Sequence, residues 1–303
     1  MKKIIHLYPL LGLTLCLTVL ACRKSITKVP TPPTDPTPVD TTTKPIVKPD
    51  SVVTQSPPFP QTPVTGCSYA PNYGDTIIYP QPTTGQDYIV SPVNNPGPGK
   101  YLSWPIGLVI DSVTGAIDVT KSETGMKYAI GFIKAGTTDT CLNDLIIGGA
   151  AYMDSVYVLA DGATQAVPYF DANPNLLSVC ATGNGCTFDV TGSAASHKVI
   201  VNSATGIIDL QKTLNGGLLG GAFGLLPVNG SSFTIPIYYR LNDPSNNALQ
   251  HIDVQLAYYS KKSLIDLSLL NGLLNKLNNI LTGNLISTTS NPRPPLIIIV
   301  RSK

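Results

Sequence analysis

The sequence predicts an all-β protein that is built from two tandem β-sandwich domains. The first observation is composition: 303 residues include 26 Gly and 27 Pro, and every acidic residue except Glu123 is Asp. Asp, Gly and Pro favour turns and strand ends, whereas Glu favours helices. The second observation is a series of short apolar runs between turn residues, and the third is a segment that occurs twice.

The apolar runs begin after Gly66 and recur at short, regular spacing. The expected strands are 75–80, 87–92, 107–111, 115–119, 127–133, 144–149, 154–160, 186–190, 197–202, 206–210, 233–239, 251–259 and 295–300. Many short strands separated by turns are typical of sandwiches and barrels.

The repeated segment is LVIDSVTGAIDVTK at 108–121 and VIVNSATGIIDLQK at 199–212, an offset of 91 residues. This offset is about the length of one immunoglobulin-like sandwich. We therefore expect two immunoglobulin-like domains, at 67–163 and 164–303.

Each copy of the repeat reads as two strands around a turn. Asp111 can accept a hydrogen bond from a backbone N–H group two residues on, and Gly115, after Thr114, can adopt the positive φ that closes the turn. In the second copy Asn202 replaces Asp111, while Thr205 and Gly206 are kept. Asn keeps the local acceptor and loses the charge, so we interpret both turns as structural and not as metal or catalytic sites. Ile110, Ile117 and Val119 are expected in the core.

The stretch WPIGLVIDSVTGAIDV, Trp104 to Val119, is similar to the P-x-G-L-x-I-D-x-x-T-G-x-I signature of bacterial immunoglobulin-like and cadherin-like repeats. The second copy keeps only the later half, so the resemblance covers about one hairpin per domain. It implies a β-sandwich fold. The calcium motifs of cadherin repeats, L-D-R-E and D-x-N-D-N, do not occur here, so the resemblance implies no calcium, and we expect no cofactor.

The N-terminus, residues 1–21, has two lysines followed by an apolar run, which is typical of a signal peptide. The run ends in Val19-Leu20-Ala21-Cys22, which resembles the lipobox of bacterial lipoproteins. The resemblance implies cleavage before Cys22 and acylation of that residue. We therefore expect a protein of the cell envelope that is attached to the lipid bilayer of the outer membrane, on a face that the sequence leaves open.

Residues 22–66 hold the lipidated Cys22 and a Pro/Thr-rich stretch in which apolar residues are sparse. Such a composition cannot bury a core, so we expect a disordered, extended stalk. The stretches at Asp40 and Asp50 look like an O-glycosylation acceptor motif of some Gram-negative bacteria.

Four cysteines remain after processing: Cys67, Cys141, Cys180 and Cys186. No C-x-x-C pair occurs, which argues against a zinc ribbon or a thioredoxin-like site. In an oxidising compartment we expect two disulfides, and we favour Cys67–Cys141 and Cys180–Cys186 among the three connectivities. Free buried thiols are the alternative.

One segment departs from the strand pattern. Leucines at 267, 270, 274, 277 and 281 recur every three or four residues, which predicts an amphipathic helix inserted at about 263–283. Ser263 and Asp266 give its capping signal. The helix is expected to cover its own domain, with partner docking as the alternative.

No motif for catalysis is found, and the protein is expected not to be an enzyme. Twenty basic and eighteen acidic residues give no basic stripe for nucleic acid. The pairs Tyr238-Tyr239 and Tyr258-Tyr259 put one ring on each face of a strand, so they are the candidate platform for a ligand.

Three functions remain open, the last of which is a hydrolase with an unrecognised site. The first is a non-catalytic structural, adhesive or binding role in the envelope, with an envelope protein or a glycan as partner. The second is a glycan-binding accessory lipoprotein of a polysaccharide-uptake system.

Overall fold

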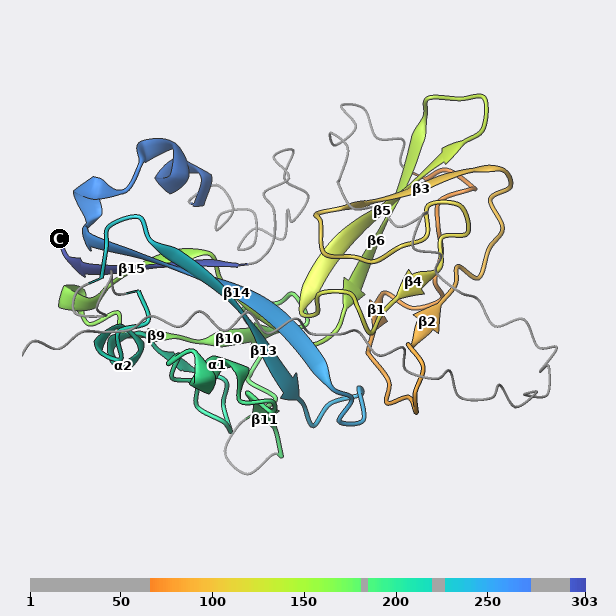
Figure 1. The fold of residues 1–303 in the computed structure, drawn as a ribbon. Helices are drawn as coiled ribbons and strands as arrows, with labels where there is room; N and C mark the ends of the chain where they lie inside the picture. The colour runs from red at the N-terminus through yellow and green to blue at the C-terminus, as the bar shows by residue number, and fades with distance from the viewer. Residues whose placement is uncertain (1–65, 181–184, 220–226, 274–294) are drawn as a thin grey trace, which may run out of the picture. The chain divides into compact units, whose positions relative to one another are not determined.

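The computed structural model describes residues 66–180, 185–219, 227–273 and 295–303, all within one compact unit, Lys44–Lys303 (Figure 1). The signal segment, Cys22, the stalk and the second half of the expected helix lie outside the described residues.

The N-terminal body, residues 66–149, contains one four-stranded sheet with the order β1-β6-β5-β3. Its strands are β1 (Ile77–Ile78), β3 (Gly99–Trp104), β5 (Met126–Lys134) and β6 (Thr140–Ile147). Strand β5 is antiparallel to both of its neighbours, whereas β1 runs parallel to β6. A second, two-stranded sheet joins β2 (Ile89–Val90) to β4 (Ile117–Asp118).

The core of this body takes side chains from both sheets. Tyr101 of β3, Ile130 of β5 and Ile147 of β6 share one buried cluster with Ile117 of β4. Ile110, Ile117 and Val119 are all buried, as the sequence predicts. Side chains that alternate between the two faces of each strand therefore fill the space between two layers.

The C-terminal body, residues 150–303, has a five-stranded sheet with the order β11-β13-β14-β15-β8. Its strands are β8 (Ser155–Val158), β11 (Thr187–Phe188), β13 (Ser232–Arg240), β14 (Gln250–Lys261) and β15 (Leu296–Ser302). The long antiparallel pair β13–β14 lies side by side in Figure 1, and β15 pairs in parallel with both β14 and β8.

Two small sheets form the other layer of the C-terminal body. They pair β7 (Ala150–Tyr152) with β10 (Pro168–Phe170) and β9 (Gln165–Ala166) with β12 (Ile208–Asp209). Phe170 and Ile208 from these sheets share a buried cluster with Ile237, Val254 and Ile299 of the large sheet. The predicted all-β class, with layered sheets, is confirmed.

Helices are short in the described parts of the chain. They are η2 (Leu159–Asp161), α1 (Ser193–Ser196), α2 (Leu210–Asn215), η3 (Lys262–Leu264) and the helical residues 267–273. None of the helices in these parts combines the length and the apolar character of a membrane span. The run at 197–202, expected as a strand, instead follows α1 and contributes only a single bridge, between Val201 and Ile208.

The helix expected at 263–283 begins later than predicted. Asp266 caps it, because its Oδ1 accepts from the backbone N–H groups of Ser268 and Leu269 at 2.8 and 3.3 Å. Ile265, which precedes the cap, and Leu273 of the helix are buried, whereas Leu267 is 73% exposed. Leu269 and Leu270 pack against the same cluster, which also contains Ile298 and Val300 of β15. Residues 274–283 lie outside the described residues.

The boundary at 163/164 stays a prediction. The structure adds that β7 and β8, which precede it, pair with strands of the C-terminal body.

Candidate functional site

The first turn, residues 111–115, is held by the buried side chain of Asp111. Its Oδ1 accepts from the backbone N–H groups of Val113 and Thr114, both at 2.9 Å. Gly115 closes the turn with φ of 71°, a conformation that glycine adopts without steric cost. The polar atoms of this turn are therefore engaged with the chain's own backbone.

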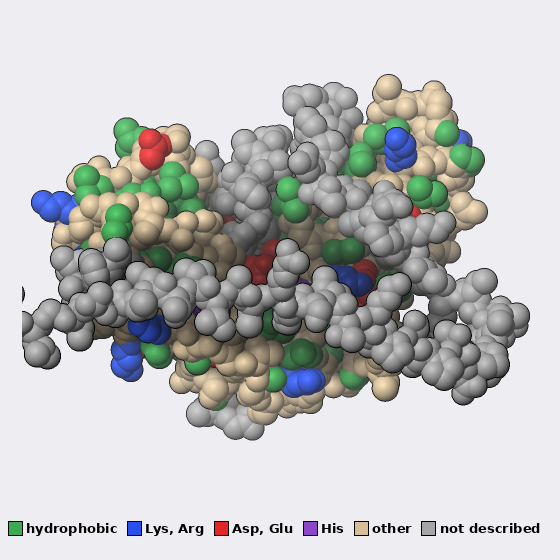
Figure 2. Space-filling view, viewed as in Figure 1, with side chains coloured by type: hydrophobic (Ala, Val, Ile, Leu, Met, Phe, Trp, Pro, Cys, Tyr) green, Lys and Arg blue, Asp and Glu red, His purple; other side chains and the backbone are tan. Residues whose placement is uncertain are grey.

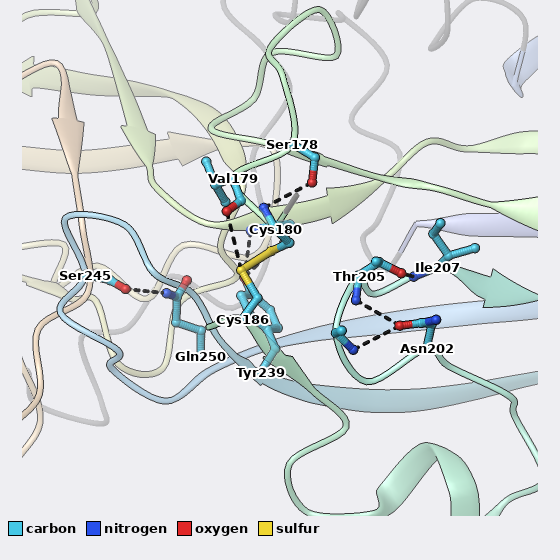
Figure 3. Close-up of a disulfide and its surroundings, with 12 residues drawn as sticks. Ser178, Val179, Cys180, Cys186, Asn202, Thr205, Ile207, Tyr239, Ser245 and Gln250 are labelled. Atoms are coloured by element: carbon cyan, nitrogen blue, oxygen red, sulfur yellow. Dashed lines mark hydrogen bonds between the residues drawn. A yellow bond between two sulfur atoms is a disulfide. The ribbon is translucent and has the colours of Figure 1, made fainter. Parts of the chain in front are cut away.

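The second turn, residues 202–206, repeats this geometry without a charge. Asn202 Oδ1 accepts from the backbone N–H groups of Ala204 and Thr205, both at 3.0 Å (Figure 3). Gly206 has φ of 74°. Replacement of a carboxylate by an amide changes none of these bonds, so in both copies the side chain acts as a turn cap.

A tyrosine hydroxyl fixes each turn from a distant strand or loop. Tyr73 Oη donates to the carbonyl oxygen of Gly115 at 2.7 Å, and Tyr152 Oη donates to that of Gly206 at 2.5 Å. Both tyrosines are buried. Sequence reasoning missed this equivalence because 79 residues separate the two tyrosines, and the repeat itself has an offset of 91.

An aromatic ring also covers each of the two glycines. A methyl group on Gly115 would lie 2.5 Å from the ring of Tyr101, and one on Gly206 would lie 2.6 Å from the ring of Phe188. The backbone N–H groups of Tyr101 and Phe188 donate to Ser112 and Ser203 at 2.8 and 2.7 Å. The two turns thus share the aromatic ring over the glycine and the backbone hydrogen bond to the serine, in addition to their sequence.

The repeated environment continues beyond each turn. Asp118 Oδ1 accepts from the backbone N–H of Lys121 at 3.1 Å, and Asp209 Oδ1 accepts from that of Lys212 at 2.8 Å. Each aspartate also forms an ion pair with the same lysine, at 2.9 and 3.0 Å. Burial would raise the pKa of Asp209, but the hydrogen bonds from Lys212 outweigh it and lower that pKa. In the first copy Asp87 adds a second carboxylate partner for Lys121, and hydrogen bonds to Asp87 and Asp118 raise the lysine pKa.

The two bodies meet at a polar cluster around Gly149. The buried hydroxyl of Tyr239 bonds to Thr124, accepts from Ala150 N at 2.9 Å and lies 3.2 Å from Ala150 O. Burial raises the pKa of Tyr239, so this phenol stays neutral. A methyl group on Gly149 would lie 2.3 Å from Gln250 Oε1, so only glycine fits there.

Asp171 ties the same cluster to the N-terminal body. Its Oδ1 accepts from Gly149 N and its Oδ2 accepts from Tyr79 Oη, both at 2.9 Å. Burial, followed by the bond to Asp171, raises the pKa of Tyr79. Burial also raises the pKa of Asp243, and the nearby charge of Asp171 adds to this, although Ser245 donates to Asp243.

The four tyrosines of the expected ligand platform do not form one surface. Tyr239 is fully buried and Tyr258 is 3% exposed, so both belong to the core. Tyr238 and Tyr259 are half-buried. In the register of the sheet Tyr238 lies opposite His251, eight residues along β14 from Tyr259. At about 3.3 Å per residue the two rings are therefore far apart. Tyr238 packs against the ring of His251, at 5.7 Å between centroids.

The cysteines pair as Cys67–Cys141 and Cys180–Cys186, with Cα–Cα distances of 6.0 and 5.4 Å. In Figure 3 the second disulfide lies beside Val179, whose carbonyl oxygen is 3.8 Å from Cys186 Sγ. The first joins the start of the N-terminal body to β6.

The charged side chains in the described parts of the chain form no cluster that resembles a metal or catalytic site. No set of three or more His, Cys, Asp and Glu side chains in the described ranges is placed to hold a metal ion. His197 ends α1 and packs on Phe233, at 5.0 Å between ring centroids. The Lys and Arg side chains visible in Figure 2 lie scattered among neutral ones.

Comparison with known proteins adds little to this geometry. No family model matches the chain, and no curated protein matches it. Among solved structures, human protocadherin-24 EC1-2 matches at 7% identity and a TM-score of 0.20, covering 60% of this chain and 92% of that one. Human CDH23 EC21-23 matches at 13% identity and a TM-score of 0.17, covering 61% and 63%. Likenesses this low carry no argument about function.

Proposed function

We propose that this is a lipid-anchored, non-catalytic protein of the bacterial cell envelope, with a structural or adhesive role carried by two layered β bodies. One observation carries the proposal. The side chains that the sequence singles out in the two turns, Asp111 and Asn202, accept hydrogen bonds from their own backbone in the same way. The duplicated residues that resemble candidates for a metal or catalytic site thus serve to stabilise turns.

The sequence supplies the location in this proposal. The lipobox-like Val19-Leu20-Ala21-Cys22 would place acyl chains on Cys22, and several acyl chains together hold a protein on a membrane. The Pro/Thr-rich stretch to residue 66 would then hold the two bodies away from the bilayer. The proposed partners are the lipid bilayer and an envelope protein or glycan.

The glycan-binding alternative has less support. It depended on one exposed ring from each pair, and the two rings outside the core, Tyr238 and Tyr259, are half-buried and lie far apart along the sheet. No observation favours it over a structural role.

Metabolic labelling with an alkyne fatty acid, followed by membrane fractionation, tests the anchor. The unaltered chain should carry the label and sediment with the outer membrane, whereas Cys22→Ala should carry none. Cys16→Ala is the matched control, because it removes a cysteine within the expected signal segment and should leave labelling intact. Label that persists on Cys22→Ala would refute acylation at Cys22. In a separate experiment, protease treatment of intact cells reports which face of the membrane the protein occupies.

A further inference from the structure

The Cys67–Cys141 disulfide occupies a particular place along the chain. Cys67 directly follows the Pro/Thr-rich stretch, and Cys141 is the second residue of β6. The bond closes a loop with a sequence separation of 74 residues. That loop contains strands β1 to β5 and most of the core of the N-terminal body.

Strand β6 leads straight into the C-terminal body. It ends at Ile147, and only Gly148 and Gly149 separate it from β7, which begins at Ala150. A covalent route therefore runs from Cys67 through the disulfide to Cys141, along β6, and into the next body. The strand is already extended, so it has little length to give when pulled.

The direct strand pairing between the start of the N-terminal body and β6 is short. Strand β1 pairs with β6 through only two residue pairs, Ile77 with Ile146 and Ile78 with Ile147. Backbone N–H groups of Ile146 and Gly148 donate to Thr76 O and Ile78 O at 2.9 and 2.8 Å, and Asn143 Nδ2 donates to Pro71 O at 2.8 Å. Each hydrogen bond of this kind contributes only modestly to net stability, whereas the disulfide is covalent.

We infer that the Cys67–Cys141 disulfide is a tension bypass, which carries force from the N-terminal anchor past the N-terminal body. This inference rests on the proposed function, because tension enters at Cys67 only if the chain is held upstream of it. Force applied to the C-terminal body by a bound partner or by flow then travels through the disulfide and β6. The loop of strands β1 to β5 carries none of it and stays folded.

The second disulfide offers a built-in comparison. Cys180–Cys186 spans a separation of only six residues within the C-terminal body, so it shields almost no chain from extension. A bypass role is thus specific to the long loop.

Optical-tweezer pulling on the mature chain, with handles at its N-terminal residue and at Lys303, tests the bypass. In the oxidised chain the described N-terminal body should give no extension step. Reduction of the held, folded molecule should add a step of roughly 250 Å, from 74 residues at about 3.5 Å each, at a force below that which unfolds the C-terminal body. Forced unfolding reports the unfolding barrier directly.

Two variants complete the experiment. Cys67→Ser with Cys141→Ser should show the added step without reductant, whereas Cys180→Ser with Cys186→Ser should lengthen the trace by only about 20 Å. If the first pair does not fold, reduction of the unaltered chain under low force gives the same measurement. The bypass is refuted if the reduced chain yields its N-terminal step only above the force that unfolds the C-terminal body, because the hydrogen bonds alone then suffice. Neither result depends on whether Cys22 is acylated, so failure of the anchor would be seen separately in the labelling experiment.

Discussion

The hydroxyl group of Tyr73 donates a hydrogen bond of 2.7 Å to the carbonyl oxygen of Gly115, 42 residues further along the chain. The same bond recurs between Tyr152 and Gly206 in the C-terminal body. The two turns, which share a sequence, are thus also held by equivalent tyrosines. These tyrosines do not follow the 91-residue offset of the repeat.

Removal of one of these hydroxyl groups should destabilise the protein. Tyr73→Phe or Tyr152→Phe leaves a buried carbonyl oxygen without its donor, which costs about 1–3 kcal/mol. Chemical denaturation followed by far-ultraviolet circular dichroism, which reports the strands of both bodies, measures the loss. Tyr238→Phe, on the half-buried face beside His251, is the control and should shift the midpoint much less. Equal shifts for all three variants would show that the turn contact is not special.

The glycines of the two turns should tolerate no side chain. Gly115→Ala and Gly206→Ala combine a positive φ with a clash against the rings of Tyr101 and Phe188. Gly136→Ala separates the two effects, because Gly136 has φ of 81° and nothing within 4 Å of an added methyl group. We expect about 1 kcal/mol for Gly136→Ala from backbone strain alone, and a clearly larger loss in the two turns. Thermal unfolding of the three variants measures the difference, and a loss at Gly115 no larger than at Gly136 would contradict the ring contact.

The charge of the turn cap should be dispensable. Asn202→Asp keeps an oxygen that can accept from Ala204 and Thr205, so it should change stability by less than about 0.5 kcal/mol. Asn202→Ala removes the acceptor and should cost about 1 kcal/mol, as the loss of a hydrogen bond does. Urea midpoints of the two variants against the unaltered chain decide this. A larger loss for Asp than for Ala would show that charge, and not the acceptor, governs the position.

Local features of this chain could be predicted from the sequence because local chemistry determines them. The turn at Asp111 follows from a short acceptor placed two residues before the donor and a glycine that closes the turn, and the cysteine pairs follow from loop length and position. Long-range features could not be predicted. Leu267 was expected in the buried stripe, but the tertiary fit of Ile265 and Leu273 against the sheet decides the helix rotation. The hydrogen bonds of Tyr73 and Tyr152 could not be predicted, because the residues around each tyrosine do not indicate a contact with a distant carbonyl group.

The cluster between the bodies should make stability depend on pH through Asp243. Burial and the charge of Asp171 raise the pKa of Asp243, so the folded state binds its proton more tightly than the unfolded state does. The contribution of protonated Asp243 to the free energy of unfolding is therefore fully present below the ordinary carboxyl pKa of about 3.9. It is lost as the pH rises through the raised value, and the ionised carboxylate remains a cost at neutral pH.

Asp243→Asn tests this directly, because the amide keeps an oxygen that can accept from Ser245 N, at 2.9 Å in the unaltered chain. The variant should melt at a higher temperature than the unaltered chain at pH 7, and the difference should shrink toward zero as the pH falls below about 4. Melting curves of both chains across this range give the difference, in which the contributions of carboxylates that do not interact with Asp243 cancel. A variant of Asp243 that is less stable at pH 7 than at pH 4, relative to the unaltered chain, would mean that the carboxylate is stabilised by its surroundings and that the cluster favours its charged form.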